Sequence, residues 1–460
     1  MPTTSPPRKA RRTRFGVLAP CCALLIASCW VTSGTAVTTA LPDASPGATN
    51  ATASASASER SALKPIDPAA FQSAVDGAAR KLFVPGAVVL LRTPQGTFEA
   101  KVGTTDPGGH TPPDAGTHFR IASNTKTMAS ALIMLLAQDG RLHLGDPVSA
   151  YVPDVPGVPG VPGGKHITIA DLLKMRSGLY DYTSAHELAA TLDADPAKAW
   201  TPQEVLAIAF RHPPEFPPDA SYDYCNTNYA LLGLIAEKAG GRPLAEQFQD
   251  RLFGPLGLRR TSLPAADDSS MPDRFSHGYM YGGSSYALVD KPYPPELQAA
   301  ARTGKPPPVD YTRQNPSYAT AAGGVISTAD DLSTWIRALV SGKVLNPTYQ
   351  REWLHSPQPE DRKAPDGQRY GYGISYQRFG PNAAMYYHGG ELPGFNSFIG
   401  HDPDNDVTLV IWTNLTLSPD GRTTANALLP TVLDEIYARL PLSPAPSSTA
   451  HAVISMDTLA

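Results

Sequence analysis

Ser123 and Lys126 lie three residues apart in "FRIASNTKTMASALIMLLAQDG", at the start of an apolar helical pattern. Residues i and i+3 of a helix share one face, so these two side chains would contact each other. The positive field of a helix N-terminus favours a developing alkoxide and disfavours a charged lysine, as an activated serine nucleophile requires. An N-capping serine beside an exposed lysine is the ordinary alternative, and this motif alone favours that interpretation.

The residues around the motif distinguish it from a chance match. Ser61 and Lys64 have the same spacing in "SALK", but that string lies in a spacer and runs into Pro65, where a helix could not bring the pair together. Behind Lys126, apolar residues recur at helical spacing and a glycine marks the expected end of the helix: Met128, Leu132, Leu135, Leu136 and Gly140. In this helix the backbone amide of Ser123 can also donate to an oxyanion.

Two further motifs follow in the chain. Tyr224 and Asn226 stand two residues apart in "SYDYCNTNYALLGLIAEKAG", ahead of a second amphipathic helical pattern. His388, Gly389 and Gly390 end an alternating strand pattern in "MYYHGGELPGFNSF". Taken singly, the first is an asparagine helix cap and the second a glycine-rich turn. Paired glycines on a strand also let another backbone or a ligand approach closely.

In this order, the three motifs resemble those of the penicillin-recognising serine hydrolases, which include class C β-lactamases, serine D-alanyl-D-alanine carboxypeptidases and related esterases and aminopeptidases. The similarity extends over about residues 66 to 440 and includes "ITIADLLKMRSGLYDY", "FGPLGLRRTSL" and "AAGGVISTADDLSTWI". The resemblance implies a two-step acyl transfer in which Ser123 attacks a carbonyl and forms an acyl-enzyme. It makes Lys126 the neighbouring base and Tyr224 the proton shuttle to the leaving group. Which of these two takes the serine proton stays open.

The resemblance also implies roles for the remaining motif residues. Asn226 would hold the amide side chain of the substrate. His388 takes the Lys/His position of the third motif and would lie near Tyr224 as electrostatic partner or proton relay. The oxyanion hole would combine the backbone amides of Ser123 and of Glu391, which directly follows the glycine pair.

Three positions depart from the family pattern. Gly389 replaces a threonine that helps to bind the substrate carboxylate in many relatives, and Glu391 adds a negative charge beside it, so the case for a β-lactam or a D-Ala-terminated substrate is weaker. Cys225 stands where serine is usual, as a small-residue substitution. "KMRSGL", with Arg176, replaces the commoner His-Thr-Ser-Gly-Leu, which we interpret as a packing change on a surface-facing helix end.

The expected function is that of an exported serine hydrolase, with a D-alanyl-D-alanine carboxypeptidase-like activity on cell-wall peptides as the leading hypothesis. A class C-like β-lactamase, or an esterase or D-aminopeptidase of the same family, is the alternative. A non-catalytic penicillin-binding sensor is a remote one. The expected partner is a small-molecule or peptide substrate, namely a peptidoglycan stem peptide or a β-lactam. The resemblance implies no cofactor, and the scattered histidines show no metal-ligand spacing.

Strand patterns near both ends of the domain, with a helix-rich middle from about 119 to 345, predict an α/β (α+β) fold. Its antiparallel sheet is formed by both ends, is flanked by helices and carries a large helical insertion. We expect a first helix within 67–83, a hairpin over 86–103, strands within 371–414 and a last helix over 424–440. The expected segments are a signal peptide over 1–36, a disordered spacer over 37–65, the hydrolase domain over 66–440 and a flexible tail over 441–460.

The N-terminal segment has the composition of an export signal. Five of the chain's 38 basic residues precede residue 15, and the apolar run that follows ends in small residues. Secretion is therefore expected, with a lipoprotein anchored through Cys29 of "IASC" as the alternative. Without this segment 33 basic residues face 42 acidic ones, which argues against a nucleic-acid partner. Three of the four cysteines also lie in it, so no intramolecular disulfide is expected after cleavage.

Overall fold

The computed structural model describes residues 62–106, 108–152, 160–289, 291–438 and 440. The chain divides into two units, Met1–Ser56 and Ala57–Ala460, and the described residues all belong to the second. The expected signal peptide over 1–36, most of the spacer over 37–65 and the tail over 441–460 lie outside the described residues. In the part of the chain that is described, no helix is both long and apolar enough to cross a membrane.

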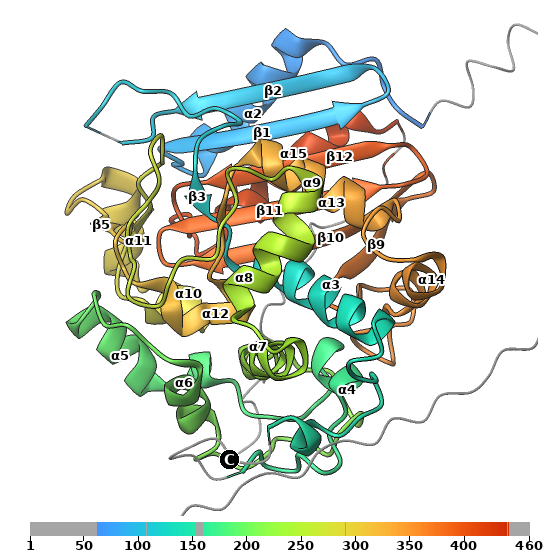
Figure 1. Ribbon diagram of the computed structural model, residues 1–460. Coiled ribbons are helices and arrows are strands. Elements are labelled where there is room, and N and C mark those ends of the chain that lie inside the picture. Colours follow the sequence, from blue (N-terminus) through green and yellow to red (C-terminus); the bar gives the residue numbers. More distant parts are fainter. Residues whose placement is uncertain (1–61, 107, 153–159, 290, 439, 441–460) are drawn as a thin grey trace, which may run out of the picture. The chain divides into compact units, whose positions relative to one another are not determined.

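The predicted sheet is present and contains strands from both ends of the domain (Figure 1). It is antiparallel, in the order β2-β1-β12-β11-β10-β9-β8-β7. Its strands are β1 Gly86–Thr93, β2 Gly96–Gly103, β7 Gln358–Pro359, β8 Arg369–Tyr370, β9 Ser375–Gly380, β10 Ala383–Leu392, β11 Phe395–Asp402 and β12 Val407–Thr413. The N-terminal hairpin joins the C-terminal strands where β1 pairs with β12, with Val89 opposite Ile411. The fold class predicted from the sequence is thus confirmed.

Helices α2 (Pro68–Lys81) and α15 (Thr424–Ile436) cover one face of the sheet. Because side chains alternate along a strand, Val89 and Leu91 pack in this layer while Val88 and Leu90 enter the larger core on the other face. The end of the expected spacer is ordered here: the backbone N–H of Lys64 donates to the carbonyl of Ile436 at 2.8 Å. The described residues just before position 66 therefore belong to the folded unit, contrary to the expected end of the spacer at 65.

The other face carries the predicted helical insertion, which holds most of the hydrophobic core. At its centre α3 (Thr125–Gln138) is buried from Thr125 to Ala137 and contacts α7 (Asn226–Gly240) and α12 (Thr320–Gly323). The other helices are α4 Ile169–Leu173, α5 His186–Ala194, α6 Pro202–Ala209, α8 Leu244–Phe248, α9 Gly254–Leu256, α10 Ser285–Leu288, α11 Pro295–Thr303, α13 Ala329–Val340 and α14 Pro347–His355. Two short strand pairs complete the unit: β3 Phe119–Arg120 with β6 Ile326–Ser327, and β4 Tyr279–Met280 with β5 Val309–Asp310.

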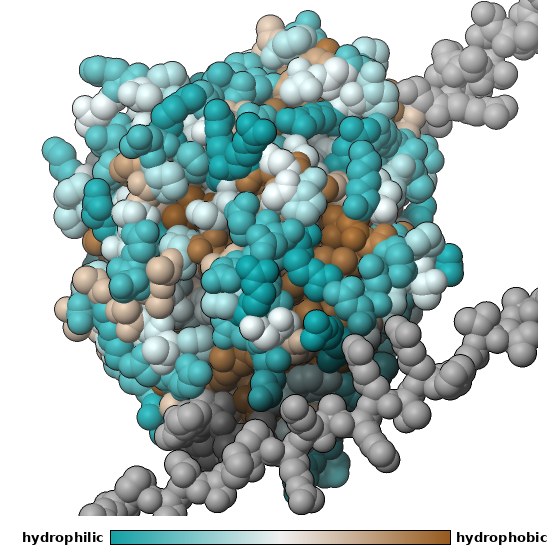
Figure 2. All heavy atoms as spheres, viewed as in Figure 1, coloured by the Kyte–Doolittle hydropathy of each residue, from teal (hydrophilic) through white to brown (hydrophobic). Residues whose placement is uncertain are grey.

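The described residues expose few large apolar side chains. Hydrophilic side chains cover most of the face drawn in Figure 2, and apolar ones occur in small patches between them. Phe83 and Val309 are the large hydrophobic side chains that are exposed among the described residues. Isolated exposed apolar residues of this kind are normal for a globular protein.

Strand β10 passes very close to the turn that holds Ser123. Ser123 lies in a 3-10 turn, η1 (Ala122–Asn124), directly before α3. A Cβ atom on Gly390 would lie 2.3 Å from the carbonyl oxygen of Ile121 and 2.6 Å from Ser397 Oγ. The close approach therefore requires glycine at 390. The sequence had suggested that the glycine pair ends the strand. In the structure β10 continues to Leu392, so the pair lies within it.

We expect the two glycines to respond differently to alanine. Gly390→Ala should lower the free energy of unfolding by about 1–3 kcal/mol, because the added methyl overpacks a buried backbone contact. Gly389→Ala is the matched control, since a Cβ there would meet its nearest neighbour, Asn426 Oδ1, at an ordinary 3.8 Å. Urea unfolding of both variants measures the difference. Equal midpoints would show that the turn can move away from β10 without cost.

Candidate active site

Lys126 lies fully buried at the centre of a hydrogen-bond cluster. Its Nζ is 2.9 Å from Ser123 Oγ, 2.7 Å from Asn226 Oδ1 and 2.8 Å from the carbonyl oxygen of Ala322. Burial lowers the pKa of the Lys126 ammonium to about 7, while the negative charge of Asp181 acts in the opposite direction. A large fraction of this lysine is therefore neutral at physiological pH, as a general base must be.

The partners of Lys126 also set the direction of its lone pair. Asn226 Oδ1 and the carbonyl of Ala322 can only accept hydrogen bonds. A neutral amine must donate its two N–H groups to these two oxygens, and its lone pair then faces Ser123 Oγ. This geometry supports Lys126, rather than Tyr224, as the group that takes the proton of Ser123. The helical spacing of apolar residues in the sequence had placed the pair on one helix face, and the structure brings the two side chains into contact.

Tyr224 lies next to the same cluster, in the loop before α7. Its ring centroid is 4.8 Å from Lys126 Nζ, and burial raises the pKa of the Tyr224 hydroxyl well above its ordinary value, against the effect of a hydrogen bond with Ser123. A phenol of this kind keeps its proton at neutral pH. It is placed to donate a proton to a leaving group at Ser123, in line with the role that the family resemblance implies.

Asn226 has both ends of its amide engaged within the protein. Besides accepting from Lys126, it donates through Nδ2 to Asp181 Oδ2 at 2.9 Å and to Thr183 Oγ1 at 3.1 Å. The role of Asn226 in holding the substrate stays a prediction. Its contacts also indicate a second role, which is to orient the amine of Lys126. Asp181 and Thr183 had no assigned role in the sequence, although "SGLYDYT" lies in a segment that resembles the family.

His388 is buried and its hydrogen bonds go elsewhere than to Tyr224. Nδ1 lies 2.6 Å from the carbonyl oxygen of Gly389, so this nitrogen carries the proton, and Nε2 accepts from the Tyr370 hydroxyl at 3.0 Å. Burial, followed by the positive charge of Lys126, lowers the pKa of the imidazole to about 3. The rings of His388 and Tyr224 have centroids 6.2 Å apart, so His388 is near Tyr224 as expected, but as a neutral ring.

Tyr370 is a site-region residue that sequence reasoning missed. It lies on β8, its ring is edge-on to Tyr224 at 6.1 Å between centroids, and it is 2% exposed. A tyrosine in a two-residue strand has no motif around it, so the sequence contained no signal that could have assigned it.

A pocket opens beside Ser123. Its polar lining includes Tyr224, Asn226 and Glu391, and its apolar wall comes from α10 and the end of β10 through Leu288 and Leu392. Among the lining residues that the structure describes, Glu391 alone has a formally charged side chain. Ser123 and Glu391, whose backbone amides were expected to form the oxyanion hole, thus border one space. A Cβ on Gly389 would instead point toward Asn426 of α15.

Two of the departures from the family pattern are core positions. Arg176 is 1% exposed and donates to the carbonyl of Pro359 at 2.7 Å, so the expectation of a surface-facing change at "KMRSGL" was wrong. Cys225 is also buried, and its Sγ donates to the carbonyl of Leu179 at 3.2 Å. Burial raises the pKa of the Cys225 thiol well above its ordinary value, which fits a small packing residue.

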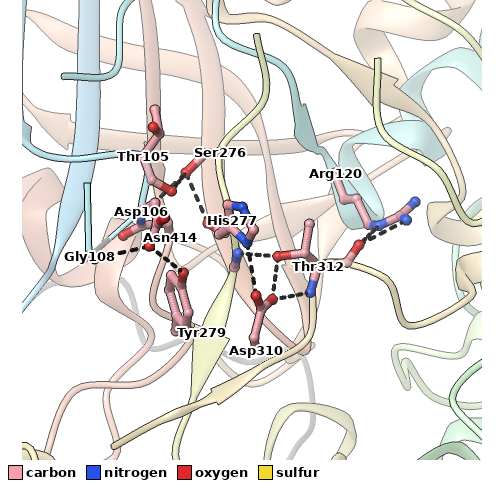
Figure 3. Close-up of polar contacts among 11 residues, drawn as sticks. Thr105, Asp106, Gly108, Arg120, Ser276, His277, Tyr279, Asp310, Thr312 and Asn414 are labelled. Atoms are coloured by element: carbon pink, nitrogen blue, oxygen red, sulfur yellow. Dashed lines mark hydrogen bonds and ion pairs between the residues drawn. The ribbon is translucent and has the colours of Figure 1, made fainter. Parts of the chain in front are cut away.

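A polar network joins β3 to segments that precede and follow α10 and α11 in the chain (Figure 3). Arg120, three residues before the nucleophile, donates through Nη2 to the carbonyls of Thr312 at 3.1 Å and Ser269 at 2.8 Å. Asp310 accepts from the backbone N–H of Thr312 at 2.8 Å and contacts His277 Nδ1 at 2.8 Å. The strand leading to Ser123 is therefore held to the segments around Ser269 and Thr312. Among the described residues no group of His, Cys, Asp and Glu side chains could hold a metal ion.

The fold and this cluster together have the arrangement that an acyl-transfer site built on a serine requires. The sequence model described as Beta-lactamase matches residues 71–432, which is most of the chain. The protein therefore belongs to the Beta-lactamase family, a family of serine hydrolases with this fold.

Solved structures agree with this assignment. A D-stereospecific amidohydrolase from Streptomyces sp. is 29% identical, with a TM-score of 0.67, over 80% of this chain and 98% of that one. The D-amino acid amidase of Ochrobactrum anthropi SV3, complexed with L-phenylalanine amide, is 27% identical, with a TM-score of 0.66, over 80% and 97% of the two chains. A penicillin binding protein from Bacillus halodurans shares the fold at 21% identity and a TM-score of 0.62, over 78% of this chain and 98% of that one.

Among curated proteins, Protein flp of Staphylococcus aureus (strain MW2) is 26% identical over 339 residues, which are 73% of this chain and 61% of the relative. Unguisins hydrolase ungD' of Aspergillus campestris is 24% identical over 69% of this chain and 56% of its own length. The chain thus spans about three fifths of the length of the curated relatives it matches.

The pKa of Lys126 predicts the pH dependence of the reaction. Because the base must be neutral, kcat/KM should rise with pH through an apparent pKa near 7 and fall tenfold per unit well below it. His388 should add no second limb between pH 4 and 7, since its pKa of about 3 lies lower. Lys126→Ala should lose about 10²–10⁴-fold in kcat. If kcat/KM showed no limb near 7 and fell only as pH rose through about 10, the lysine would work as a cation.

Loss of the Tyr370 hydroxyl should destabilise the protein. Tyr370→Phe leaves the buried Nε2 of His388 without its donor, which costs about 1–3 kcal/mol of unfolding free energy. Tyr376→Phe is the control, because that side chain is only partly buried and packs on Tyr386. Urea unfolding measures both. An unchanged midpoint for Tyr370→Phe would show that His388 finds another donor.

Proposed function

We propose that this chain is an exported serine amidohydrolase that cleaves amides or short peptides of D-amino acids bearing a free amino group. The observation that carries the proposal is that Glu391 lines the pocket beside Ser123 and that its negative charge acts on Tyr224 in the same pocket. An anionic wall attracts the ammonium group of an amino acid amide and repels the carboxylate of a penicillin or of a D-Ala terminus. The apolar wall of Leu288 and Leu392 suits an apolar side chain.

The named relatives support this choice of substrate. Two of the proteins with solved structures above 25% identity are a D-stereospecific amidohydrolase and a D-amino acid amidase, each covered almost fully by this chain. The second was crystallised with an amino acid amide. The proposed preference of this chain for D-amino acids rests on its similarity to these two enzymes. Export rests on the composition of the N-terminal segment.

The proposed reaction follows from the contacts in the site. Lys126 takes the Ser123 proton as Oγ attacks the substrate carbonyl, and the oxyanion is stabilised by the backbone amides of Ser123 and Glu391. Tyr224 donates its proton to the departing ammonia or amine as the C–N bond breaks and recovers one from Lys126. Water then attacks the acyl-enzyme, releasing the amino acid and restoring the Ser123 hydroxyl.

A D-alanyl-D-alanine carboxypeptidase on cell-wall peptides, the leading hypothesis from the sequence, is the second candidate. Asn426 is the observation that favours it. Its Nδ2 would lie 4.0 Å from a Cβ on Gly389 and already donates to Thr423 Oγ1 at 3.1 Å. The second N–H of this amide is a neutral donor that a substrate carboxylate could use. A β-lactamase activity would depend on the same donor.

A substrate panel separates these candidates. We expect D-phenylalanine amide to be hydrolysed with a kcat/KM at least about tenfold above that of its N-acetyl derivative, since a charged hydrogen bond contributes about 1.5–3 kcal/mol. Glu391→Gln should lower the first value by about 10- to 100-fold and leave the second within about twofold. Ser123→Ala is the inactive control.

Two outcomes would overturn the amidase proposal. Faster release of D-alanine from a diacetyl-L-lysyl-D-alanyl-D-alanine tripeptide than of ammonia from any amide would identify a carboxypeptidase. Rapid hydrolysis of a penicillin, with no hydrolysis of amides, would identify a β-lactamase. Mass spectrometry of the Ser123 peptide detects the acyl-enzyme in each case.

A further inference from the structure

We propose that Asp181 is a positioning residue that fixes the amide of Asn226 and, through it, aims the lone pair of Lys126 at Ser123. The inference rests on the proposed serine hydrolysis and concerns a carboxylate that the three motifs leave out. Asp181 caps the short helix η3 (Tyr182–Ser184) and is 3% exposed, on the far side of Asn226 from Lys126.

The carboxylate of Asp181 is surrounded by neutral donors. Oδ1 accepts from the backbone N–H of Thr183 at 3.1 Å, and Oδ2 accepts from Thr183 Oγ1 at 2.8 Å and from Asn226 Nδ2 at 2.9 Å. Because an ionised carboxylate can only accept, the direction of each of these bonds is fixed. The hydroxyl of Thr183 donates its hydrogen bond to Asp181. It can therefore only accept from Asn226 Nδ2, which lies 3.1 Å from Thr183 Oγ1.

This polarity decides which end of the Asn226 amide faces the lysine. The two ends of an asparagine amide have nearly the same shape, and only hydrogen bonding separates them. With Asp181 and Thr183 both accepting from Nδ2, Oδ1 must face Lys126 Nζ, as it does at 2.7 Å. A reversed amide would point its NH₂ group at Lys126, opposing the ammonium and occupying the lone pair of the neutral amine.

Asp181 also acts on Lys126 through its charge. The groups around Lys126 are the rings of Tyr224 and Tyr229, the thiol of Cys225 and the imidazole of His388, together with Asp181. Asp181 is the carboxylate whose charge raises the pKa of Lys126 against burial. The Asp181 side chain therefore has two separable effects. Its oxygens accept from Asn226 and so orient that amide, and its charge holds the pKa of Lys126 near 7 against the effect of burial.

Asp181→Asn tests both effects in the full-length protein. We expect kcat to fall about 10- to 100-fold with little change in KM, because the base is misdirected. The acid limb of kcat/KM should move below 7 by about one pH unit, because the charge is lost. Asp195→Asn is the control: this carboxylate is exposed, and its removal should leave the limb and kcat unchanged.

Exchanging the two side chains tests the orientation directly. In Asp181→Asn/Asn226→Asp, the new carboxylate accepts from Lys126 and the new amide donates to it, so the Lys126 lone pair is again directed at Ser123. The carboxylate now touches Lys126 and raises its pKa, so the acid limb should move above 7. The plateau of kcat above that limb should recover at least about tenfold over Asp181→Asn. If Asp181→Asn does not fold, Thr183→Val replaces it: kcat should fall several-fold while the acid limb stays in place.

A readout without turnover separates this inference from the proposed function. NMR titration of ¹³C-labelled lysine, with the Lys126 signal assigned by Lys126→Arg, gives the pKa directly in wild type and in Asp181→Asn. A lower pKa in the variant supports the inference even if no amide, peptide or penicillin is hydrolysed. An unchanged pKa and an unchanged kcat for Asp181→Asn would overturn it.

Discussion

The chemistry of this protein depends on one costly interaction, the burial of the Lys126 amine beside Ser123. An ammonium group taken out of water loses its hydration, so the fold shifts the lysine toward its neutral form, with a pKa of about 7. Helix α3 makes this possible because it is enclosed on all sides between the sheet and the helical insertion. A surface helix with the same Ser-x-x-Lys spacing would hold a charged lysine and an ordinary serine.

The two ends of the domain complete the site by meeting in one sheet. Strand β1 from the N-terminal hairpin pairs with β12, and β10 is thereby held against the turn of Ser123. The approach is close enough to require glycine at position 390. It brings Glu391 and Ser123 to one pocket, although they are far apart in the sequence. The catalytic arrangement is therefore a property of the whole unit and could not be formed by the helical insertion alone.

Much of this could be predicted from the sequence, because the informative patterns are local. The helix behind Ser123 follows from apolar periodicity, and the hairpin over 86–103 from its turn and alternation. The unpredicted parts depend on long-range contacts. Tyr370 reaches His388 from a two-residue strand, and Arg176 looked exposed because a charged residue in a short helix end usually is. Asp181 lay in a recognisable segment, but its role appears only when its three donors are seen together.

Under the function that we propose, the protonation states of the site allow a single carboxylate to select the substrate. Burial keeps Tyr224 protonated and His388 neutral, and Lys126 is largely neutral at the pH where it acts as a base. Asp181 is enclosed behind Asn226, away from the pocket lining. A substrate entering the pocket therefore meets a nearly uncharged surface apart from Glu391. Because few charges compete with it, the function that we propose makes the sign of that side chain the reason why an ammonium, and not a carboxylate, is tolerated next to the reacting carbonyl.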